Sequence, residues 1–142
     1  MDEELVGRLR YSVTRLARLL RQQDQSGLSP TTTAMLAAIG RDGPITLGEL
    51  AAHEQVAPPT ITKSVDKLES AGFVERLRDT ADRRVCRVTL TTAGRKQLDT
   101  NRSRRTAWLA RQLRALPDDD LATLAAAVEV LERLTLAPEA VR

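Results

Sequence analysis

Two segments near the ends of the chain carry apolar residues at helical spacing. In residues 3–23, the apolar residues at three- and four-residue steps are Leu5, Leu9, Val13, Leu16 and Leu20. After Pro117 the same spacing recurs at Leu121, Leu124, Val128 and Leu131. Residues at these steps share one face of a helix, and alternating steps of three and four form a seam for a second helix. The pattern therefore predicts a helix at each end with an apolar face to bury.

Capping signals place further helices between these two. Ser29 followed by Pro30 predicts a helix start, because the serine oxygen accepts a backbone N–H bond and proline needs none in the first turn. Thr46 and Glu49 fit a capping box, in which each residue satisfies a backbone N–H of the other. This box opens a short helix over residues 47–54.

A fourth helix and a β-hairpin follow. Pro58 and Pro59 lie where a new helix begins, and Gly72 suits the left-handed residue that ends it. Residues 73–78 alternate loosely and residues 85–90 alternate well between apolar and polar positions, and a polar loop joins them. Two alternating runs with a polar connection predict a two-stranded hairpin.

The order of the elements predicts the fold class. A long basic helix, capped by Thr91 or Thr92, extends to about residue 114, and Pro117 opens the last helix. The chain is therefore predicted to be mainly α, an α+β winged helix with about six helices and a two-stranded β-hairpin as the wing.

The composition agrees with a helical domain. The 142 residues include one Trp, one Tyr and one Phe, so the core must consist of Leu, Val, Ile and Ala, which suits packed helices. The single cysteine, Cys86, excludes an internal disulfide. No apolar run resembles a signal peptide or a membrane span. We therefore expect a cytoplasmic protein with no membrane partner.

The charge is distributed unevenly around a net value of +3. Residues 57–114 hold 14 Lys or Arg against 6 Asp or Glu, whereas the rest of the chain holds 8 against 13. A basic centre between acidic ends indicates that the middle of the chain faces a polyanion. A solvated, Arg-rich helix is the alternative explanation, and charge alone does not distinguish the two.

The helix pair 47–54 and 58–71 is a candidate helix-turn-helix. In this motif the second helix enters the major groove and presents its N-terminal residues to base edges. Threonine can donate to phosphates or bases, and lysine can reach a guanine or a phosphate. The candidate DNA-contacting residues of this helix are Pro59, Thr60, Thr62, Lys63, Ser64 and Lys67. An ordinary surface helix is the alternative.

The hairpin adds a second candidate contact. Its loop carries Arg83 and Arg84 at the tip, with Asp82 beside them. A guanidinium on a narrow hairpin can enter a minor groove, and a neighbouring carboxylate can hold that side chain extended. The alternative is that the aspartates and arginines only hold the turn together, although the two roles can coexist.

These segments resemble the MarR family of winged-helix regulators over nearly the whole chain. The matching stretches are residues 45–51, 59–69, 72–76, 79–84 and 88–94, which include an Asp, then Asp-Arg-Arg, then Leu-Thr and a Gly. The resemblance implies that the helix 58–71 lies in the major groove. It also implies that Arg84 enters the minor groove, that Asp82 orients it, and that Arg83 stays near the backbone.

The resemblance further implies a homodimer that binds a pseudo-palindromic operator in double-stranded DNA, most often as a repressor. We expect residues 1–27 to form a dimerisation helix and residues 28–94 the winged helix-turn-helix lobe. Residues 95–142 would then supply the long connecting helix and the C-terminal dimerisation helix. In a two-fold dimer the recognition helices lie about 34 Å apart, so the half-sites recur about one turn apart.

The resemblance is less specific about an effector, since family members respond to small anionic aromatic compounds, to metals or to oxidants. The only histidine, His53, and the only thiol, Cys86, argue against a metal site and against a peroxide sensor. Cys86 is expected to be a buried, inert thiol on the apolar face of a strand. A small organic effector remains open, near Tyr11, Arg15 and Met35, and no cofactor or metal is expected.

Two other classes of function compete with DNA binding. An enzyme needs a nucleophile–base pair, a metal cluster or a phosphate loop, and the sequence offers none of these, so no catalytic residue is assigned. A winged helix used only for protein–protein assembly is the stronger alternative. Such a module has no need for the set Thr60, Thr62, Lys63 and Arg84, so removing the charges of this set should leave it functional.

Overall fold

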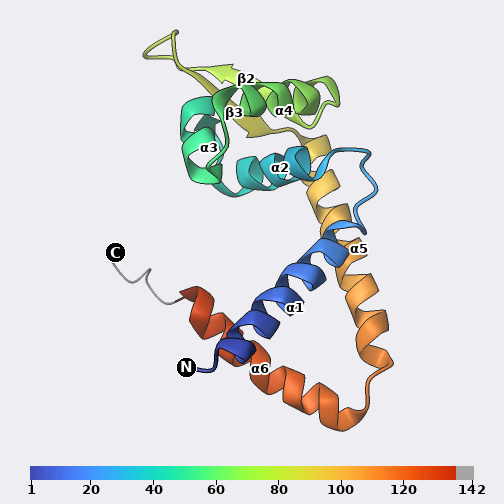
Figure 1. The fold of residues 1–142 in the computed structure, drawn as a ribbon. Helices are drawn as coiled ribbons and strands as arrows, with labels where there is room; N and C mark the ends of the chain where they lie inside the picture. Colours follow the sequence, from blue (N-terminus) through green and yellow to red (C-terminus); the bar gives the residue numbers. More distant parts are fainter. Residues whose placement is uncertain (137–142) are drawn as a thin grey trace. The chain divides into compact units, whose positions relative to one another are not determined.

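The computed structural model describes residues 1–136, and Figure 1 shows its helices and strands. The chain divides into two compact units, the first Met1–Thr106 and the second starting at Ala107. Helix α5 (Thr92–Arg114) begins in the first unit and ends in the second. The last part of the predicted segment 95–142, residues 137–142, lies outside the described residues.

Helix α1 (Glu3–Arg21) opens the first unit. Asp2 caps it by accepting the backbone N–H bonds of Glu4 at 3.0 Å and Leu5 at 3.3 Å. Acidic residues in the first turn and arginines in the last complement the helix dipole. No residue of α1 is buried, and Leu5 and Val13 are 58 % and 47 % exposed. The predicted apolar face is present, and the single chain leaves it uncovered.

Two capped helices follow at the positions that the sequence predicts. Ser29 caps α2 (Pro30–Asp42) through a 3.2 Å hydrogen bond from a first-turn N–H. Thr46 caps α3 (Leu47–Glu54) by accepting the backbone N–H of Glu49 at 3.1 Å. Among the hydrogen bonds of residues 1–136, only this half of the predicted capping box is formed.

Helix α4 (Pro58–Ser70) buries one side and exposes the other. Ile61, Val65 and Leu68 are at most 1 % exposed, and their spacing of four and three puts them on one face. Gly72 follows the helix with a φ of 80°, a left-handed conformation that glycine adopts without a Cβ clash. The predicted start, inward face and end of this helix are confirmed.

The predicted two-stranded hairpin is present, and a third short strand joins it. Strands β2 (Val74–Arg78) and β3 (Cys86–Leu90) form the expected antiparallel hairpin. Strand β1 (Ile45–Thr46) pairs with the other edge of β3, with Ile45 opposite Val88, so the order is β1-β3-β2. Two residues are too few to show the alternation that marks a strand in a sequence. Strand β1 was not predicted from the sequence for this reason.

The core of the first unit lies between α2, α3, α4 and the sheet (Figure 1). Its buried apolar side chains are Met35, Leu36, Ala38, Ile39, Ile45, Leu50, Ile61, Val65, Leu68, Val74 and Val88. Each fully buried Val, Leu or Ile contributes about 1.5–3 kcal/mol relative to an exposed one. This part of the chain therefore has an aliphatic core of its own, as the composition predicts.

The start of α5 is fixed against the end of α4. The Thr91 hydroxyl donates to the carbonyl oxygen of Gly72 at 2.6 Å and accepts the backbone N–H bond of Gly94 at 3.1 Å. A Cβ at position 94 would lie 2.0 Å from the carbonyl oxygen of Phe73, so only glycine fits there. The stretch Thr91–Gly94 thus caps α5, and Gly94 lets the helix approach the backbone of Phe73.

The second unit contains the end of α5 and helix α6 (Asp118–Leu136). Three aspartates in the first turn of α6 complement its positive end. No residue of α6 is buried, and Leu124, Val128 and Val130 are 39 %, 44 % and 47 % exposed. This helix also carries an apolar face.

Within residues 1–136, no helix is both long enough and apolar enough to cross a bilayer.

Candidate nucleic-acid interface

The outer side of α4 is exposed and carries polar or small residues. Its exposed members that the sequence singled out are Pro59, Thr60, Thr62, Lys63 and Lys67. Short side chains lie near the start of the helix, and Lys63 and Lys67 follow about one and two turns further along. A surface of this kind can approach a duplex closely and still carry positive charge toward it. Contact of these residues with DNA stays a prediction.

Ser64 is the exception among the predicted contacts of α4. It is 5 % exposed, and its Oγ accepts a hydrogen bond from the hydroxyl of Thr32 at 3.5 Å. Because Ser64 follows Ile61 by three positions, it lies on the inward face of the helix. Ser64 joins α4 to α2, so little of its side chain is accessible to DNA, and its contact with DNA stays a prediction.

The Thr62 hydroxyl was predicted to donate a hydrogen bond to DNA, but it donates within α4 instead. It donates to the carbonyl oxygen of Pro58 at 3.1 Å, so its proton is already used within the helix. Toward DNA, the hydroxyl can act as an acceptor and the methyl group can contact the methyl of a thymine.

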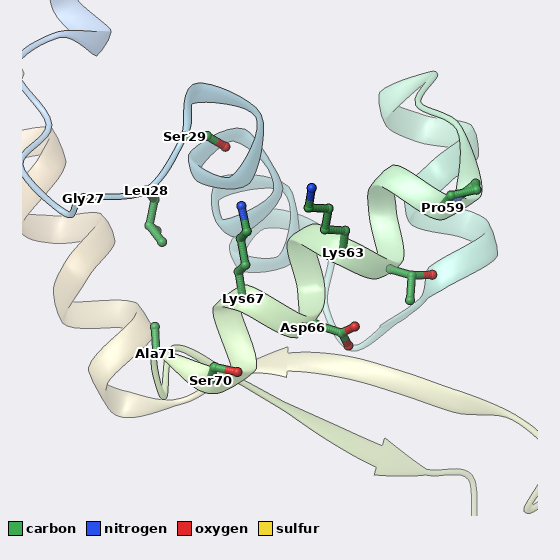
Figure 2. Close-up of a pocket in the computed structure, with 10 residues that line it drawn as sticks. Gly27, Leu28, Ser29, Pro59, Lys63, Asp66, Lys67, Ser70 and Ala71 are labelled. Atoms are coloured by element: carbon green, nitrogen blue, oxygen red, sulfur yellow. The ribbon is translucent and has the colours of Figure 1, made fainter.

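A groove of about 920 Å³ lies along α4 beside the loop that precedes α2. Figure 2 shows Lys63 and Lys67 extending toward the start of α2, near Ser29, whereas Asp66 points away from both lysines. Two ammonium groups, the positive end of a helix and one carboxylate, that of Asp66, therefore line the same groove. Such a groove suits the phosphate backbone of a nucleic acid.

The tip of the hairpin holds the arginine–aspartate pair that the sequence predicts. Arg84 donates from Nε to Oδ1 of Asp82 at 3.1 Å and from Nη2 to Oδ2 at 3.1 Å. These bonds hold the pKa of the Asp82 carboxyl below its usual range and raise the pKa of Arg84. The Arg84 side chain is nevertheless 91 % exposed. Asp82 therefore fixes a guanidinium that faces solvent, ready for an outside partner.

A second aspartate holds the loop of the hairpin together. Asp79 accepts the backbone N–H bonds of Ala81 at 2.7 Å and Asp82 at 3.2 Å through Oδ1, and its Oδ2 binds Arg87. The Ala81 N–H, followed by the Arg87 guanidinium, lowers the pKa of Asp79. Arg83 is exposed beside this turn. The two roles foreseen for the loop thus coexist: Asp79 closes the turn, and Asp82 both accepts the backbone N–H bond of Arg84 at 3.0 Å and orients its guanidinium.

Arg76 and Asp66 are not among the predicted site residues, although the structure joins them beside α4. The Arg76 guanidinium donates to Asp66 at 2.7 Å and to Glu69 at 3.1 Å. One feature of the sequence could have indicated this contact: Arg76 follows Val74 by two positions, so both side chains lie on the same side of β2. Val74 is buried, so that side of the strand faces inward.

The three predicted effector residues do not come together. Tyr11 is 60 % exposed on α1, and Arg15 lies beside it with Nη1 3.4 Å from the phenol oxygen. Met35 is 2 % exposed in the core, on the face of α2 that also carries Leu36 and Ile39. A ligand cannot reach Met35 without displacing the core, so its assignment to an effector pocket was wrong.

Two neighbouring cavities instead flank the outer side of α2. One of about 610 Å³ lies among α1, the loop after it, α2 and α5, and Arg18, Arg21, Asp24 and Arg105 line it. Asp24 binds Arg105 there, with Arg105 Nε 2.9 Å from Asp24 Oδ1, and this bond raises the pKa of Arg105. The cavity therefore has a basic wall and two acids, Asp24 and Glu54, each paired with an arginine.

The second cavity, of about 460 Å³, lies between α2 and α5 and shares Arg105 with the first. Arg95, Asn101 and Arg102 also line it. Asn101 is 3 % exposed, and its Oδ1 accepts from Gln97 Nε2 at 2.8 Å. Within residues 1–136 its Nδ2 has no hydrogen-bond acceptor. An unpaired donor in a cavity lined by four arginines, of which Arg41 is the fourth, favours an anion as the occupant.

The single histidine and the single thiol occupy separate places. His53 is 55 % exposed, and its Nδ1 lies 3.8 Å from Oδ2 of Asp42. Cys86 is half-buried on β3, so the expectation of a fully buried thiol is met only in part. Residues 1–136 contain no group of three or more His, Cys, Asp or Glu that could hold a metal ion.

The arrangement defines a class of protein. A short helix, a turn, a second helix with an exposed polar face and a hairpin with an arginine at its tip make a winged helix-turn-helix. The sequence model of the MarR family matches residues 28–86. An HTH-type transcriptional regulator from Mycobacterium leprae (strain TN) is 32 % identical over 134 residues, which cover 94 % of each chain. The chain belongs to the MarR family of transcriptional regulators.

Solved structures agree with this assignment. A transcriptional regulator protein from Pseudomonas aeruginosa PA01 matches with a TM-score of 0.83 and 35 % sequence identity, covering 96 % of this chain and 98 % of that one. FabT of Streptococcus pneumoniae, solved in complex with DNA, matches with a TM-score of 0.67 and 21 % identity, covering 94 % and 97 %. The likeness to FabT is a likeness of fold.

Proposed function

We propose that this protein is a sequence-specific repressor that binds a pseudo-palindromic operator in double-stranded DNA as a homodimer. One observation carries the proposal: the exposed face of α4 and the exposed Arg84, held by Asp82, are two positively charged elements of one folded unit. The protein acts in the cytoplasm, where its DNA partner lies.

In this proposal α4 enters the major groove. Pro59 and Thr60 approach the base edges, because they lie at the start of the helix, and Lys63 reaches a guanine or a phosphate. Lys67 and the start of α2 bind the phosphate backbone through the groove that they share. The hairpin lies over the adjacent minor groove, where Arg84 inserts and Arg83 stays near the backbone.

The dimer in this proposal is held by α1 and α6. Each helix exposes an apolar face, and neither helix contains a buried residue. Covering these faces with the same helices of a second copy removes apolar side chains from water, which stabilises the dimer. Two copies related by a two-fold axis present their α4 helices about 34 Å apart, one turn of the duplex.

In this proposal the protein represses transcription by occupying its operator. A dimer that covers two half-sites and the minor groove beside them excludes other proteins from that stretch of duplex. It needs no further surface to do so. The sense of regulation is therefore proposed as negative, and an operator that overlaps a promoter is the expected arrangement.

We further propose that a small organic anion in the two cavities flanking α2 releases the protein from DNA. Arginines line both cavities, and the second contains the unpaired Nδ2 of Asn101. The test is thermal stabilisation by a panel of aromatic carboxylates that begins with benzoate, with benzamide as the uncharged control. Stabilisation by a carboxylate that is lost in Arg102→Gln supports the site. Equal effects of benzoate and benzamide count against an anion site.

An assembly module that does not bind DNA is the alternative function, and one experiment distinguishes it from a sequence-specific repressor. Selection of bound duplexes from a random pool, followed by footprinting of the enriched sequence, is the direct test. We expect two half-sites about 10 base pairs apart and an affinity that falls steeply as salt rises, because phosphate contacts release counterions. No enrichment together with a flat salt response favours the assembly module.

A further inference from the structure

Arg76 connects strand β2 of the wing to two carboxylates of α4. Its Nη2 donates to Oδ1 of Asp66 at 2.7 Å, and its Nη1 donates to Oε1 of Glu69 at 3.1 Å. The Arg76 side chain is 31 % exposed, less than those of Asp66 at 58 % and Glu69 at 42 %. Both ends of the guanidinium are therefore engaged within the chain.

Local geometry produces this bridge. Arg76 follows the buried Val74 by two positions, so both side chains leave β2 on the side that faces the helices. Asp66 and Glu69 are three residues apart on α4, so they lie on one side of the helix. A strand packed against this side of the helix places one guanidinium within reach of both carboxylates.

The two carboxylates create an electrostatic problem for DNA binding. Asp66 lies on α4 next to Lys67 and one turn from Lys63, on the helix that is proposed to enter the major groove. An unpaired carboxylate there repels the phosphates on both sides of the groove and offsets the attraction of a lysine. Arg76 offsets one of the two negative charges. Figure 2 shows that Asp66 points away from both lysines.

We propose that Arg76 is a positioning residue for operator binding, which acts by offsetting one of the two negative charges of Asp66 and Glu69 and by fixing the positions of both carboxylates on α4. It does so without touching DNA. The proposal rests on the proposed function, since it concerns how α4 approaches phosphates. The same bridge also fixes the start of the wing against α4, so it helps to set the wing's orientation.

The test compares four proteins on one operator duplex and one unrelated duplex: the wild type, Arg76→Gln, the pair Asp66→Asn/Glu69→Gln, and the triple variant. Fluorescence anisotropy measures binding over a series of salt concentrations. We expect Arg76→Gln to weaken binding to both duplexes about tenfold, because two unpaired carboxylates then face the phosphates. The triple variant, which lacks these carboxylates, should bind within about twofold of the wild type.

The salt dependence separates this role from a direct phosphate contact. A side chain that binds a phosphate lowers the slope of log affinity against log salt by about one when it is removed. We expect the triple variant to keep the wild-type slope. Lys96→Gln, which removes one charge from an exposed position on α5 outside α4 and the wing, is the matched control and should bind like the wild type.

Melting by circular dichroism shows whether each variant is folded. If Arg76→Gln does not fold, the pair Asp66→Asn/Glu69→Gln still tests the proposal, because the proposal predicts that this pair binds DNA at least as tightly as the wild type. Weaker binding by the folded pair overturns the proposal. So does a folded Arg76→Gln that binds like the wild type, or a folded triple variant as weak as Arg76→Gln. A wild-type protein that binds neither duplex instead overturns the proposed function.

Discussion

The winged lobe and the terminal helices differ in how they obtain their stability. The lobe buries aliphatic side chains between three helices and a sheet, with Leu36, Leu50 and Val65 fully inaccessible. Helices α1 and α6, each taken by itself, bury no residue at all. The lobe therefore has an apolar core within one chain, whereas α1 and α6 expose apolar faces that the proposed dimer would cover. In the proposed function, the reading of DNA and the pairing of chains therefore reside in separate parts of the chain.

The largest expected effect comes from charging the apolar face of α1. Leu9 and Leu16 are each 42 % exposed on this face. We expect Leu9→Asp/Leu16→Asp to give a monomer, because charges cannot be buried unpaired in an apolar interface. Operator affinity should fall by about 10²–10⁴-fold when the two half-sites are no longer linked. Sedimentation velocity and anisotropy measure the two quantities.

The control for that experiment is Thr14→Asp, which adds the same charge to an exposed position on the opposite side of α1. It should leave the dimer intact. A double variant that stays dimeric contradicts the division between the two parts of the molecule. A variant whose lobe melts together with the loss of the dimer contradicts the independence of the lobe's core.

The second effect is a loss of stability in the lobe itself. Leu36 is 0 % exposed at the centre of the core. Leu36→Ala should lower the free energy of unfolding by about 2–5 kcal/mol, because it removes buried apolar contacts and leaves a cavity. Denaturant unfolding followed by circular dichroism measures this change. A change below about 1 kcal/mol would show that the lobe does not depend on this core.

The third effect concerns the wing. Arg84→Gln should weaken operator binding by about 1–3 kcal/mol if the guanidinium makes a specific groove contact. Stability should not change, since the side chain is 91 % exposed. Asp82→Asn should give a smaller loss in the same direction, because Arg84 is present but less well oriented. Unchanged affinity of Arg84→Gln at physiological salt contradicts the role of Arg84 in the minor groove.

The smallest effect is a pH dependence confined to the hairpin loop. The pKa of Asp79 is lowered in the folded chain, first by the Ala81 N–H and then by Arg87. A lowered pKa means that the stabilisation is present above the unfolded value of about 3.9 and is lost as pH falls through the folded value. The Ala81 amide resonance should therefore be constant from pH 7 to about pH 5 and shift only in stronger acid. Asp79→Asn should abolish the shift, and a shift that begins near neutral pH contradicts this cause.

The sequence could predict those parts of the site that depend on near neighbours. Asp82 and Arg84 are two positions apart, and their pairing was predicted and is present. The exposure of Lys63 and Lys67 follows from the helical period once the inward residues are identified. The near-complete burial of Ser64 was not predicted, because a small polar residue by itself gives no signal of burial. Its side depends on the period, which sets it beside Ile61.

By itself, the sequence determined the limits of the helices, the hairpin and the polar face of α4. These features depend on caps and spacings that act within a few residues, as Ser29 and Thr46 do at the starts of α2 and α3. Only the tertiary structure decided that β1 completes the sheet, that Met35 is core and that Arg76 spans from the wing to Asp66 and Glu69. Such contacts join residues from different elements. Their partners are set by packing, which leaves no local pattern in the chain.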